Sequence, residues 1–388
     1  MLWNFFLFET KLILRNRKNL FLGLFLLLFF WLFFLYYSQT EPESLEDQKR
    51  QEANVIDSIF HSFPLTQEDM PEGQAIYQNY VEQSSLINFQ IYYLGLDDAS
   101  EDYIENGLRL NELRVEALEL GNSGVPDYLL KTEEEIVEEN ALLTHIQEHQ
   151  LPLQPDVFVA SHFLVVALSI MSGFLFYSVV LLSGSEILVY EQRHRSVMNG
   201  FPLGFMKRIH AKISIHFIYI FTFLIVGLFA GGLYAAKESG VGDFSYPVLI
   251  YQNGGFETIS TIRYFQYVLL AAALTTLMVL YLSVLLNMIF KNAYASVLIG
   301  LGLFFLPDLV MAMGVETTLL YTIKYVDFSS VLSGHSAGES GNTKLDYWHA
   351  MLGLLGLIIL LISMIYAKLK FSFFPKAPAL LNKEDSNA

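Results

Sequence analysis

Two histidines and a glutamate in the middle of the chain stand at a spacing that can bind zinc. The string is H-I-Q-E-H over residues 145–149. On a helix, side chains four residues apart face the same side, so His145 and His149 could hold zinc while Glu148 acts as a general base in peptide hydrolysis. The residues that follow directly, 150–152, supply no third ligand. We therefore expect an exposed acidic helix end here and no bound metal, with a membrane-anchored zinc peptidase as the weaker hypothesis.

Other catalytic chemistry is restricted by what the chain lacks. It has no cysteine, which excludes disulfides, thiolate nucleophiles and cysteine metal sites. The string G-x-x-x-x-G-K-[ST] is also missing, so the chain has no P-loop of its own for nucleotide phosphates. We expect no enzyme and no cofactor bound by this chain, and any ATP-driven work would come from a partner protein.

The elements that must position these residues are apolar segments. The chain has 388 residues, of which 53% are hydrophobic and 16% charged, and its mean hydropathy is +0.41. A segment of about 18 apolar residues is long enough to cross a bilayer as a helix. Six such segments are predicted to span: Asn19–Tyr37, Val157–Leu182, Ile213–Ala236, Tyr264–Phe290, Ala293–Met313 and His349–Ala367. Pro307 would end or kink the fifth.

The negative charge of the chain is concentrated in one segment. The whole chain carries a net charge of −16, but residues 38–156 contain 26 acidic and 5 basic residues, and the remainder is net basic. A uniformly acidic enzyme is therefore excluded. Nucleic-acid binding through a broad basic surface is excluded as well, because the basic residues form short scattered clusters.

The basic residues also predict the orientation in the membrane. Cytoplasmic loops carry an excess of Lys and Arg. With the N-terminus inside, the inner segments hold 14 basic residues and the outer loops 237–263 and 313–346 hold 4. We therefore expect both termini in the cytoplasm, and the acidic segment outside the cell membrane. An exposed domain without cysteine is typical of a bacterium.

The fold class that follows is an all-α polytopic membrane protein. Amphipathic patterns over 72–93, 98–120 and 126–149 predict a mainly helical extracellular domain in the segment 38–156. Residues 1–18 predict an interfacial helix before the first span, although a plain extension of that span is the alternative. The expected organisation is residues 1–18, first span 19–37, outer domain 38–156, five further spans within 157–367 with a cytoplasmic loop 183–212, and tail 368–388.

Few polar residues fall within the apolar segments, and four of them lie in the fourth. These are Thr275, Thr276, Ser283 and Asn287. Polar side chains inside a bilayer usually face another helix or a cavity. They are candidates for a translocation path, with simple packing between helices as the alternative.

The loop 183–212 holds the most informative pattern. It combines an acidic and then a basic stretch with an apolar-proline turn and further basic residues. The candidate contact residues for a partner protein are Glu186, Glu191, Arg193, Arg195, Phe201, Pro202, Lys207, Arg208 and Lys212. A loop that only follows the excess of inner bases is the alternative, but it would have no need of the Phe201-Pro202-Leu203 turn.

These residues resemble the type-2 ABC exporter permeases. In that family the second spanning helix leads through an acidic position and an apolar-proline turn to basic residues that open the third, and Glu191, Phe201-Pro202-Leu203 and Lys207 to Lys212 are similar. The opening Phe8-Glu9-Thr10-Lys11 and the join at Phe290-Lys291-Asn292 are similar too. The chain departs from the family at Arg195-Ser196, where Gly-Thr is common, and at Met198-Asn199-Gly200.

The resemblance implies a permease subunit that exports an amphipathic cargo such as a peptide, an antimicrobial or a lipid-like molecule. Residues 191–205 would form a coupling helix seated in a cytoplasmic ATPase, with Glu191, Arg193 and Arg195 paired across the contact. The implied partners are that ATPase, which binds ATP and Mg²⁺, a second permease copy or paralogue, and the bilayer, with no nucleic acid. A non-transporting sensor or scaffold with a ligand-binding outer domain is the rival hypothesis.

Overall fold

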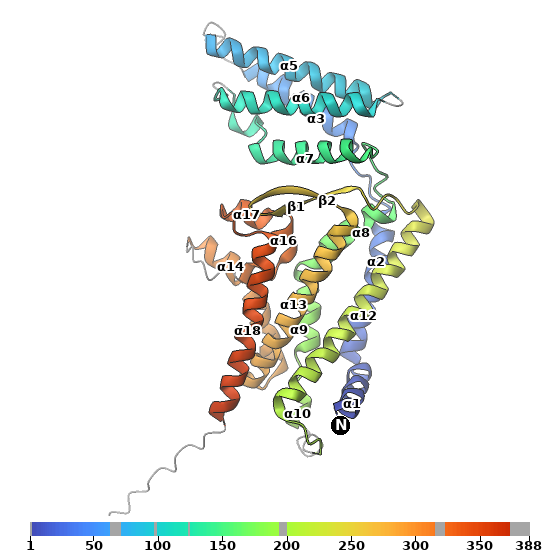
Figure 1. Cartoon of the computed structure of the whole chain (residues 1–388), viewed down its shortest axis with the longest axis vertical. Coiled ribbons are helices and arrows are strands. Elements are labelled where there is room, and N and C mark those ends of the chain that lie inside the picture. Colours follow the sequence, from blue (N-terminus) through green and yellow to red (C-terminus); the bar gives the residue numbers. More distant parts are fainter. Residues whose placement is uncertain are drawn as a thin grey trace, which may run out of the picture.

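The computed structural model of the chain describes residues 2–62, 71–96, 99–122, 125–193, 200–314 and 323–372. The protein is mostly helical, with 78% of its residues in helices (Figure 1). Among these residues, six helices are long and apolar enough to cross a membrane, as the sequence predicts. They are α2 (Arg17–Tyr37), the helical stretch Phe174–Glu191, α12 (Phe205–Ser239), α13 (Thr261–Phe290), α14 (Ala293–Ala312) and α18 (Tyr347–Ser372).

The longest contact in the bundle is between α2 and α12. Gly227 and Gly231 of α12 make it close, because a Cβ atom at Gly227 would overlap the carbonyl oxygen of Leu26 and one at Gly231 would overlap Phe30. Small residues four apart on a helix let two backbones approach in a membrane, where packing rather than water exclusion holds helices together. The first and third spans therefore form one closely packed pair.

The second crossing differs from the prediction of one helix over Val157–Leu182. The structure divides it into α8 (Ala160–Ser172) and α9 (Phe174–Gly184). Gly173 lies between them with φ −86° and ψ −130°, outside the helical region. Both pieces pack against α12 and α13. The prediction of a continuous helix is wrong because an apolar run gives no sign of a backbone break inside it.

Helix α14 coincides with the predicted fifth span, Ala293–Met313. It runs through Pro307 and ends only at Ala312, so the proline does not terminate it. The next residue, Asp308, has a side chain that is 63% exposed, and its Oδ1 lies 3.3 Å from Nζ of Lys324. Asp308 is therefore a surface charge of this helix rather than an acid in the interior of the bundle.

An antiparallel hairpin of β1 (Pro247–Gln252) and β2 (Gly255–Ser260) is the departure from an all-α fold. Its turn contains Asn253 and Gly254, both with positive φ, and this pair is the strongest short signal of a hairpin turn. The hairpin lies between the helical bundle and α7 (Glu133–His149), which contacts both strands (Figure 1). Two short helices, α16 (Phe328–Leu332) and α17 (His335–Ser340), lie near it.

Residues 45–149 form a separate layer of helices at one end of the bundle, which we call the acidic helical domain (Figure 1). Its elements are α3 (Leu45–Ser62), α5 (Pro71–Leu94), α6 (Ser100–Glu119), η1 (Asp127–Leu129) and α7. Helix α5 packs on α3 and α6, and α6 packs on α7. Helix α7 begins later than predicted because Thr132 caps it: Thr132 Oγ1 accepts from the Glu135 amide, and Glu135 Oε2 accepts from the Thr132 amide.

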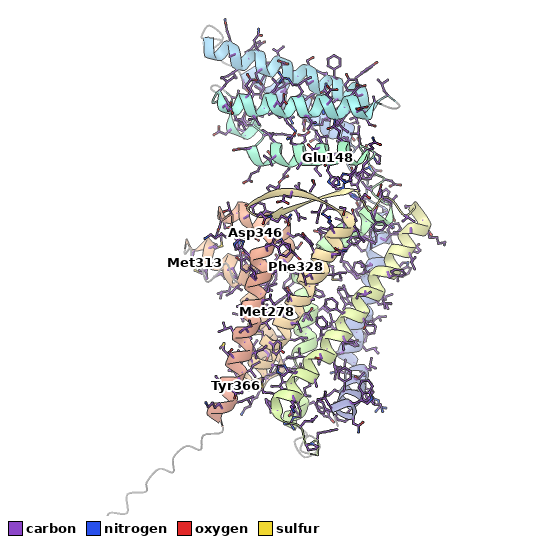
Figure 2. All side chains as sticks on the ribbon, viewed as in Figure 1. Glu148, Met278, Met313, Phe328, Asp346 and Tyr366 are labelled. Carbon is purple, nitrogen blue, oxygen red and sulfur yellow. The ribbon has the colours of Figure 1, made fainter. Side chains whose placement is uncertain are left out.

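The opposite end of the bundle carries α1 (Leu2–Arg15) and α10 (Val189–Arg193). Asn16 separates α1 from α2 with ψ 115°, and its side chain accepts a hydrogen bond from the Lys18 amide. Helix α1 is therefore a separate helix, and it packs on α12. The side chains of the whole molecule are drawn in Figure 2, where Glu148 labels the domain end and Tyr366 the opposite end.

Candidate functional site

Four charged side chains meet at the end of the bundle opposite the acidic helical domain. Nζ of Lys212 lies 2.6 Å from Oε1 of Glu9, and Nη2 of Arg208 lies 2.9 Å from Oε1 of Glu191. The two pairs are joined by a 4.0 Å approach of Lys212 to Oε2 of Glu191. We call these four residues the α1–α12 charge cluster. It connects α1 with α10 and α12, two helices that begin more than 170 residues after α1 ends.

The α1–α12 charge cluster is shielded from solvent. Glu9 is 5% exposed, Glu191 7% and Lys212 2%. Burial raises the pKa of Glu9 above its ordinary value. The ammonium of Lys212 lowers this pKa, but not enough to bring it back to the ordinary value. Removing one partner of such a pair leaves an uncompensated buried charge, so both pairs must form for this end of the protein to pack as it does.

An aromatic cluster lies beside these charges. The ring of Phe201 is 5.3 Å from that of Phe5 and 5.4 Å from that of Phe8. Tyr190, Leu203 and Ala211 complete the apolar contact. The apolar-proline turn of the loop is therefore attached to α1. Pro202 and Lys207 remain exposed.

The structure thus brings together part of the site that the sequence predicts. Glu191, Arg208 and Lys212 face inward and pair with one another or with Glu9, a residue of the N-terminal string that the sequence does not predict as their partner. Glu186 lies apart, 3.3 Å from Nζ of Lys18. Arg193 ends α10, and Arg195 lies outside the described residues. Their contact with an ATPase stays a prediction.

A groove of about 800 Å³ opens next to the charge cluster. The beginning of α2, the end of α9, the first half of α12 and the join between α13 and α14 all contribute to its lining. His216 lies at this groove, and its Nδ1 is 3.0 Å from the buried hydroxyl of Ser183. Polar groups therefore extend from the charge cluster into the bundle.

The four polar residues of α13 are fully buried in helix packing. Thr276 Oγ1 donates to the Ala272 carbonyl, and Asn287 Nδ2 donates to the Ser283 carbonyl. Gly184 of α9 lies directly against Ser283. These contacts within and between helices fit the packing alternative, and a role of Thr275, Thr276, Ser283 and Asn287 in a translocation path stays a prediction.

The two histidines at the end of α7 stack on each other, with ring centroids 4.1 Å apart. His145 Nε2 lies 3.3 Å from the Ser245 carbonyl oxygen, and His149 Nδ1 lies 3.0 Å from the His145 carbonyl oxygen. Partial burial lowers the pKa of His145. Glu148 is exposed, and within the residues that the structure describes no three His, Cys, Asp or Glu side chains gather at a metal-binding distance.

The chain contains one serine motif, so an expectation that the G-x-S-x-G string is absent is wrong. Gly334-His335-Ser336-Ala337-Gly338 fits the G-x-S-x-G pattern of a nucleophile elbow. That pattern requires a strand before the serine and an exposed hydroxyl, whereas here the short helix α16 precedes it and Ser336 is 3% exposed. His335 pairs with Glu339. The motif therefore lacks the geometry of a hydrolase site.

A network of five charged residues lies inside the acidic helical domain. Each of two carboxylates, Glu52 and Glu139, contacts all three cations, Lys49, Arg114 and Lys131, at 2.7–3.1 Å. We call these residues the domain ion network. The cations hold the pKa of Glu139 well below its usual range against the opposing effect of burial, and they lower that of Glu52 as well.

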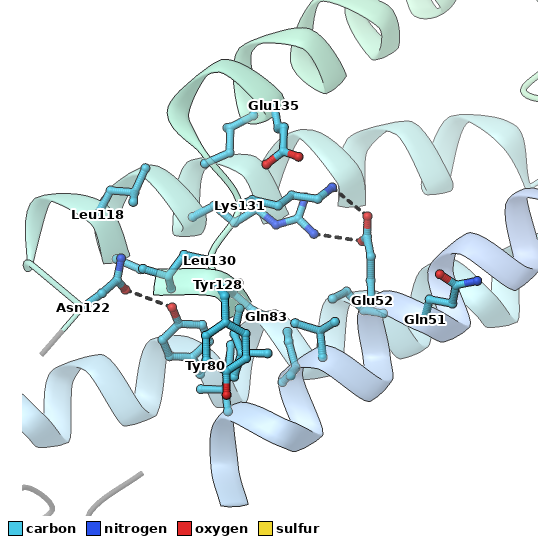
Figure 3. Close-up of a pocket in the computed structure, with 18 of the residues that line it drawn as sticks. Gln51, Glu52, Tyr80, Gln83, Leu118, Asn122, Tyr128, Leu130, Lys131 and Glu135 are labelled. Carbon is cyan, nitrogen blue, oxygen red and sulfur yellow. Dashed lines mark hydrogen bonds and ion pairs between the residues drawn. The ribbon is translucent and has the colours of Figure 1, made fainter. Parts of the chain in front are cut away.

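A cavity of about 420 Å³ adjoins this network inside the domain (Figure 3). Lys131 and Arg114 reach Glu52 at one end of it, and the Tyr80 hydroxyl donates to Asn122 Oδ1 at the other. Burial raises the pKa of Tyr80 to about 12, so this phenol stays protonated and donates at physiological pH. Apolar side chains from α3, α5 and α6 line the remainder.

No known protein family, curated protein or solved structure matches this chain. The residues and their geometry are therefore the basis for a functional assignment.

Proposed function

We propose that the chain is the membrane-spanning permease subunit of an ATP-binding-cassette exporter that moves an amphipathic cargo outward. A separate ATPase subunit binds ATP and Mg²⁺ and supplies the energy. Two permease chains, identical or paralogous, form the transport unit in the cell membrane. In this assignment the α1–α12 charge cluster lies on the cytoplasmic side, and the acidic helical domain lies outside.

The observation that carries the proposal is the attachment of the loop to two membrane elements at once. Phe201 of the loop packs on Phe5 and Phe8 of α1, and Lys212 binds Glu9 of the same helix. Lys212 itself belongs to α12, which packs along α2 through glycine contacts. A push on the loop by an ATPase therefore reaches the first and third spans together.

A coupling element needs a rigid connection on one side and an accessible surface on the other. Pro202 and Lys207 stay exposed while Phe201 between α1 and the loop is half-buried. An apolar centre with charged residues around it is typical of a protein contact. This arrangement suits a loop that binds an ATPase with its outer face and transmits the movement through its inner face.

Affinity purification tests the proposal directly. The tagged chain is purified in mild detergent from its native cell, and the co-purifying proteins are identified by mass spectrometry. We expect one P-loop ATPase in about equal amount, with an ATPase rate that rises when the permease is present. Recovery of the chain without any nucleotide-binding partner would contradict the proposal.

Matched variants locate the contact. We expect Phe201→Ala to lower ATPase recovery and ATPase stimulation at least about fivefold, because it removes the apolar anchor of the loop. Tyr92→Ala is the control, since Tyr92 is 62% exposed on α5 of the acidic helical domain, at the other end of the molecule from the loop. Equal losses in the two variants would indicate a general effect on folding rather than coupling.

The rival function is a non-transporting sensor or scaffold whose outer domain binds a ligand. The cavity beside the domain ion network favours it, because a polar end and an apolar remainder suit a small amphipathic ligand (Figure 3). In that case the loop recruits a cytoplasmic signalling protein in place of an ATPase. The same purification separates the two functions by the protein that is recovered.

A further inference from the structure

A second cavity lies where the acidic helical domain meets the membrane bundle. It measures about 550 Å³ and is enclosed by α3 and α7 on the domain side and by β1 and the start of α8 on the bundle side. Figure 1 shows α7 facing the ends of the membrane helices across the hairpin layer. A molecule that leaves the bundle, or that approaches from the outer surface of the bilayer, would pass this layer.

The lining of the cavity has an apolar and a charged part. Leu142 and Ile146 of α7, Val165 of α8, and Val248 and Leu249 of β1 form the apolar part, which we call the floor, and Ser161 and His162 of α8 also line the cavity. The roof consists of charged residues of α3 and α7, including part of the domain ion network. An apolar floor and a charged roof within one cavity fit a molecule that is itself amphipathic.

The sign of the charge on that molecule follows from Glu138. Glu52 and Glu139 on the roof are saturated by three cations each, and Glu135 is committed to the cap at Thr132. Glu138 is half-buried at the cavity and makes no ion pair or hydrogen bond among the described residues. Burial and the neighbouring Glu135 and Glu134 raise its pKa. A cation beside Glu138 would relieve this unfavourable environment.

The charge of the segment that contains the domain acts in the same direction. This segment, residues 38–156, carries 26 acidic and 5 basic residues. A surface potential of one sign concentrates ligands of the opposite sign and accelerates their association. Cations are therefore attracted to the domain before they reach the cavity.

We propose that this cavity binds an amphipathic cation, with its ammonium or guanidinium group at Glu138 and its apolar part on the floor formed by α7, α8 and β1. The inference rests on the proposed export function, since it narrows the cargo from amphipathic molecules in general to cationic ones. It assigns the cavity a place at the outer end of the transport path. Glu138 is the residue that determines charge selectivity.

Binding to the full chain in phosphatidylcholine nanodiscs tests the proposal without any ATPase. The probe is dodecylammonium carrying a diazirine, and the matched anion is dodecyl sulfonate carrying the same group, both at pH 8 with empty nanodiscs subtracted. We expect saturable binding of the cation at least about tenfold tighter than that of the anion. After photolysis, crosslinks to residues 138–149 and 247–249 are expected.

Variants separate charge recognition from the apolar floor. Glu138→Gln is expected to weaken cation binding about tenfold, which corresponds to about 1.4 kcal/mol, and to leave anion binding unchanged. Val248→Trp, which fills the cavity, weakens both probes. Glu119→Gln is the control because it removes the same charge from an exposed position on α6 of the same domain. Equal binding of cation and anion, or an unchanged Glu138→Gln variant, would overturn the proposal.

The result is independent of the test of the export function. If cations bind as expected but no ATPase is recovered with the chain, cation binding at the cavity is supported and the sensor function gains support. If an ATPase is recovered but the cation does not bind in preference to the anion, the export function is supported and the cargo site proposed here is wrong.

Discussion

The two charge clusters of this protein lie at opposite ends of the molecule and differ in how their members are connected. In the domain ion network, each carboxylate contacts all three cations, and the contacts join α3, α6 and α7 of one compact domain. In the α1–α12 charge cluster, Lys212 and Glu9 form one short pair, Glu191 and Arg208 form another, and only a 4.0 Å approach joins them.

The difference bears on mechanical behaviour. A network in which every charge has several partners resists the loss of any single contact during motion, because the remaining ones hold the geometry. In a cluster of two single pairs, the loss of one pair leaves only the other. The helices of the acidic helical domain are therefore joined by several contacts per charge, whereas α1 and α10 are each joined to α12 by one short ion pair.

The largest effect is expected for Glu139→Gln in the domain ion network. It leaves three cations with one carboxylate, and removal of a partner from a buried ionic network costs about 3–5 kcal/mol of unfolding free energy. Thermal and denaturant unfolding of the purified chain, followed through the helical signal, measures the loss. Glu134→Gln, an exposed neighbour on α7, serves as control and should change stability by less than about 0.5 kcal/mol. Matching losses in both variants would show that the network has no special role.

A somewhat smaller effect is expected for Lys212→Met in the α1–α12 charge cluster. It leaves the buried carboxylate of Glu9 without its cation, which costs about 3 kcal/mol, and it loosens α1. Since the chain has no native cysteine, a single Ala211→Cys at the α1 contact reports the loosening by its rate of maleimide labelling.

The double variant Glu9→Gln with Lys212→Met sharpens this result. Neither charge then remains buried alone, so we expect more than half of the lost stability to return. Faster labelling in the double variant than in Lys212→Met would mean that the pair does more than balance charge. The two clusters could then no longer be compared as sets of compensated charges.

Acid should act on the domain ion network with a defined sign. The pKa values of Glu52 and Glu139 are lowered in the folded protein, so the unfolded chain binds more protons than the folded one between the lowered and the ordinary pKa, about 4.3. The stabilisation is complete above the ordinary value and is lost as the pH falls toward the lowered one, by up to about 1.4 kcal/mol per pH unit for each carboxylate.

Unfolding measured from pH 7 to pH 3 checks this expectation. Stability should stay level from pH 7 to about pH 5 and then decrease, and Glu139→Gln should show a shallower decrease. A domain that becomes more stable on acidification would contradict the assignment of the network as ionised and paired.

The smallest effect is expected for the exposed pair of Arg50 and Glu46 on α3. Its atoms are 2.6 Å apart, as close as Lys212 and Glu9, but the Arg50 side chain is 60% exposed. Solvent screens such a pair, so Arg50→Ala should cost no more than about 0.5 kcal/mol. A loss as large as that of Lys212→Met would show that distance, rather than burial, determines the value of these ion pairs.

Much of the fold follows from local pattern. Five of the six predicted spans coincide with α2, α12, α13, α14 and α18, because a run of apolar residues long enough to cross a bilayer must satisfy its backbone internally as a helix. Three helices of the acidic helical domain, α5, α6 and α7, follow from three- and four-residue spacing, whereas α3 (Leu45–Ser62) was not predicted. The hairpin could have been predicted from Asn253-Gly254, whose signal was present and overlooked.

The sequence likewise identifies only part of the candidate site. The loop residues Glu191, Phe201 and Lys212 stand out by type and spacing in the sequence. Their pairing with Glu9 and Phe5 does not, because these residues lie about 200 positions earlier and no local pattern connects the two segments.

The amino-acid sequence by itself therefore determined the membrane-spanning segments, the acidic helical domain and the loop that stands out for contact with a partner. Those properties depend on composition and periodicity within about 20 residues. Only the tertiary structure decided the break at Gly173, the inward direction of Glu191 and the cavity at Glu138. Each of these depends on which distant helix lies opposite a residue, and packing between helices, rather than local preference, makes that choice.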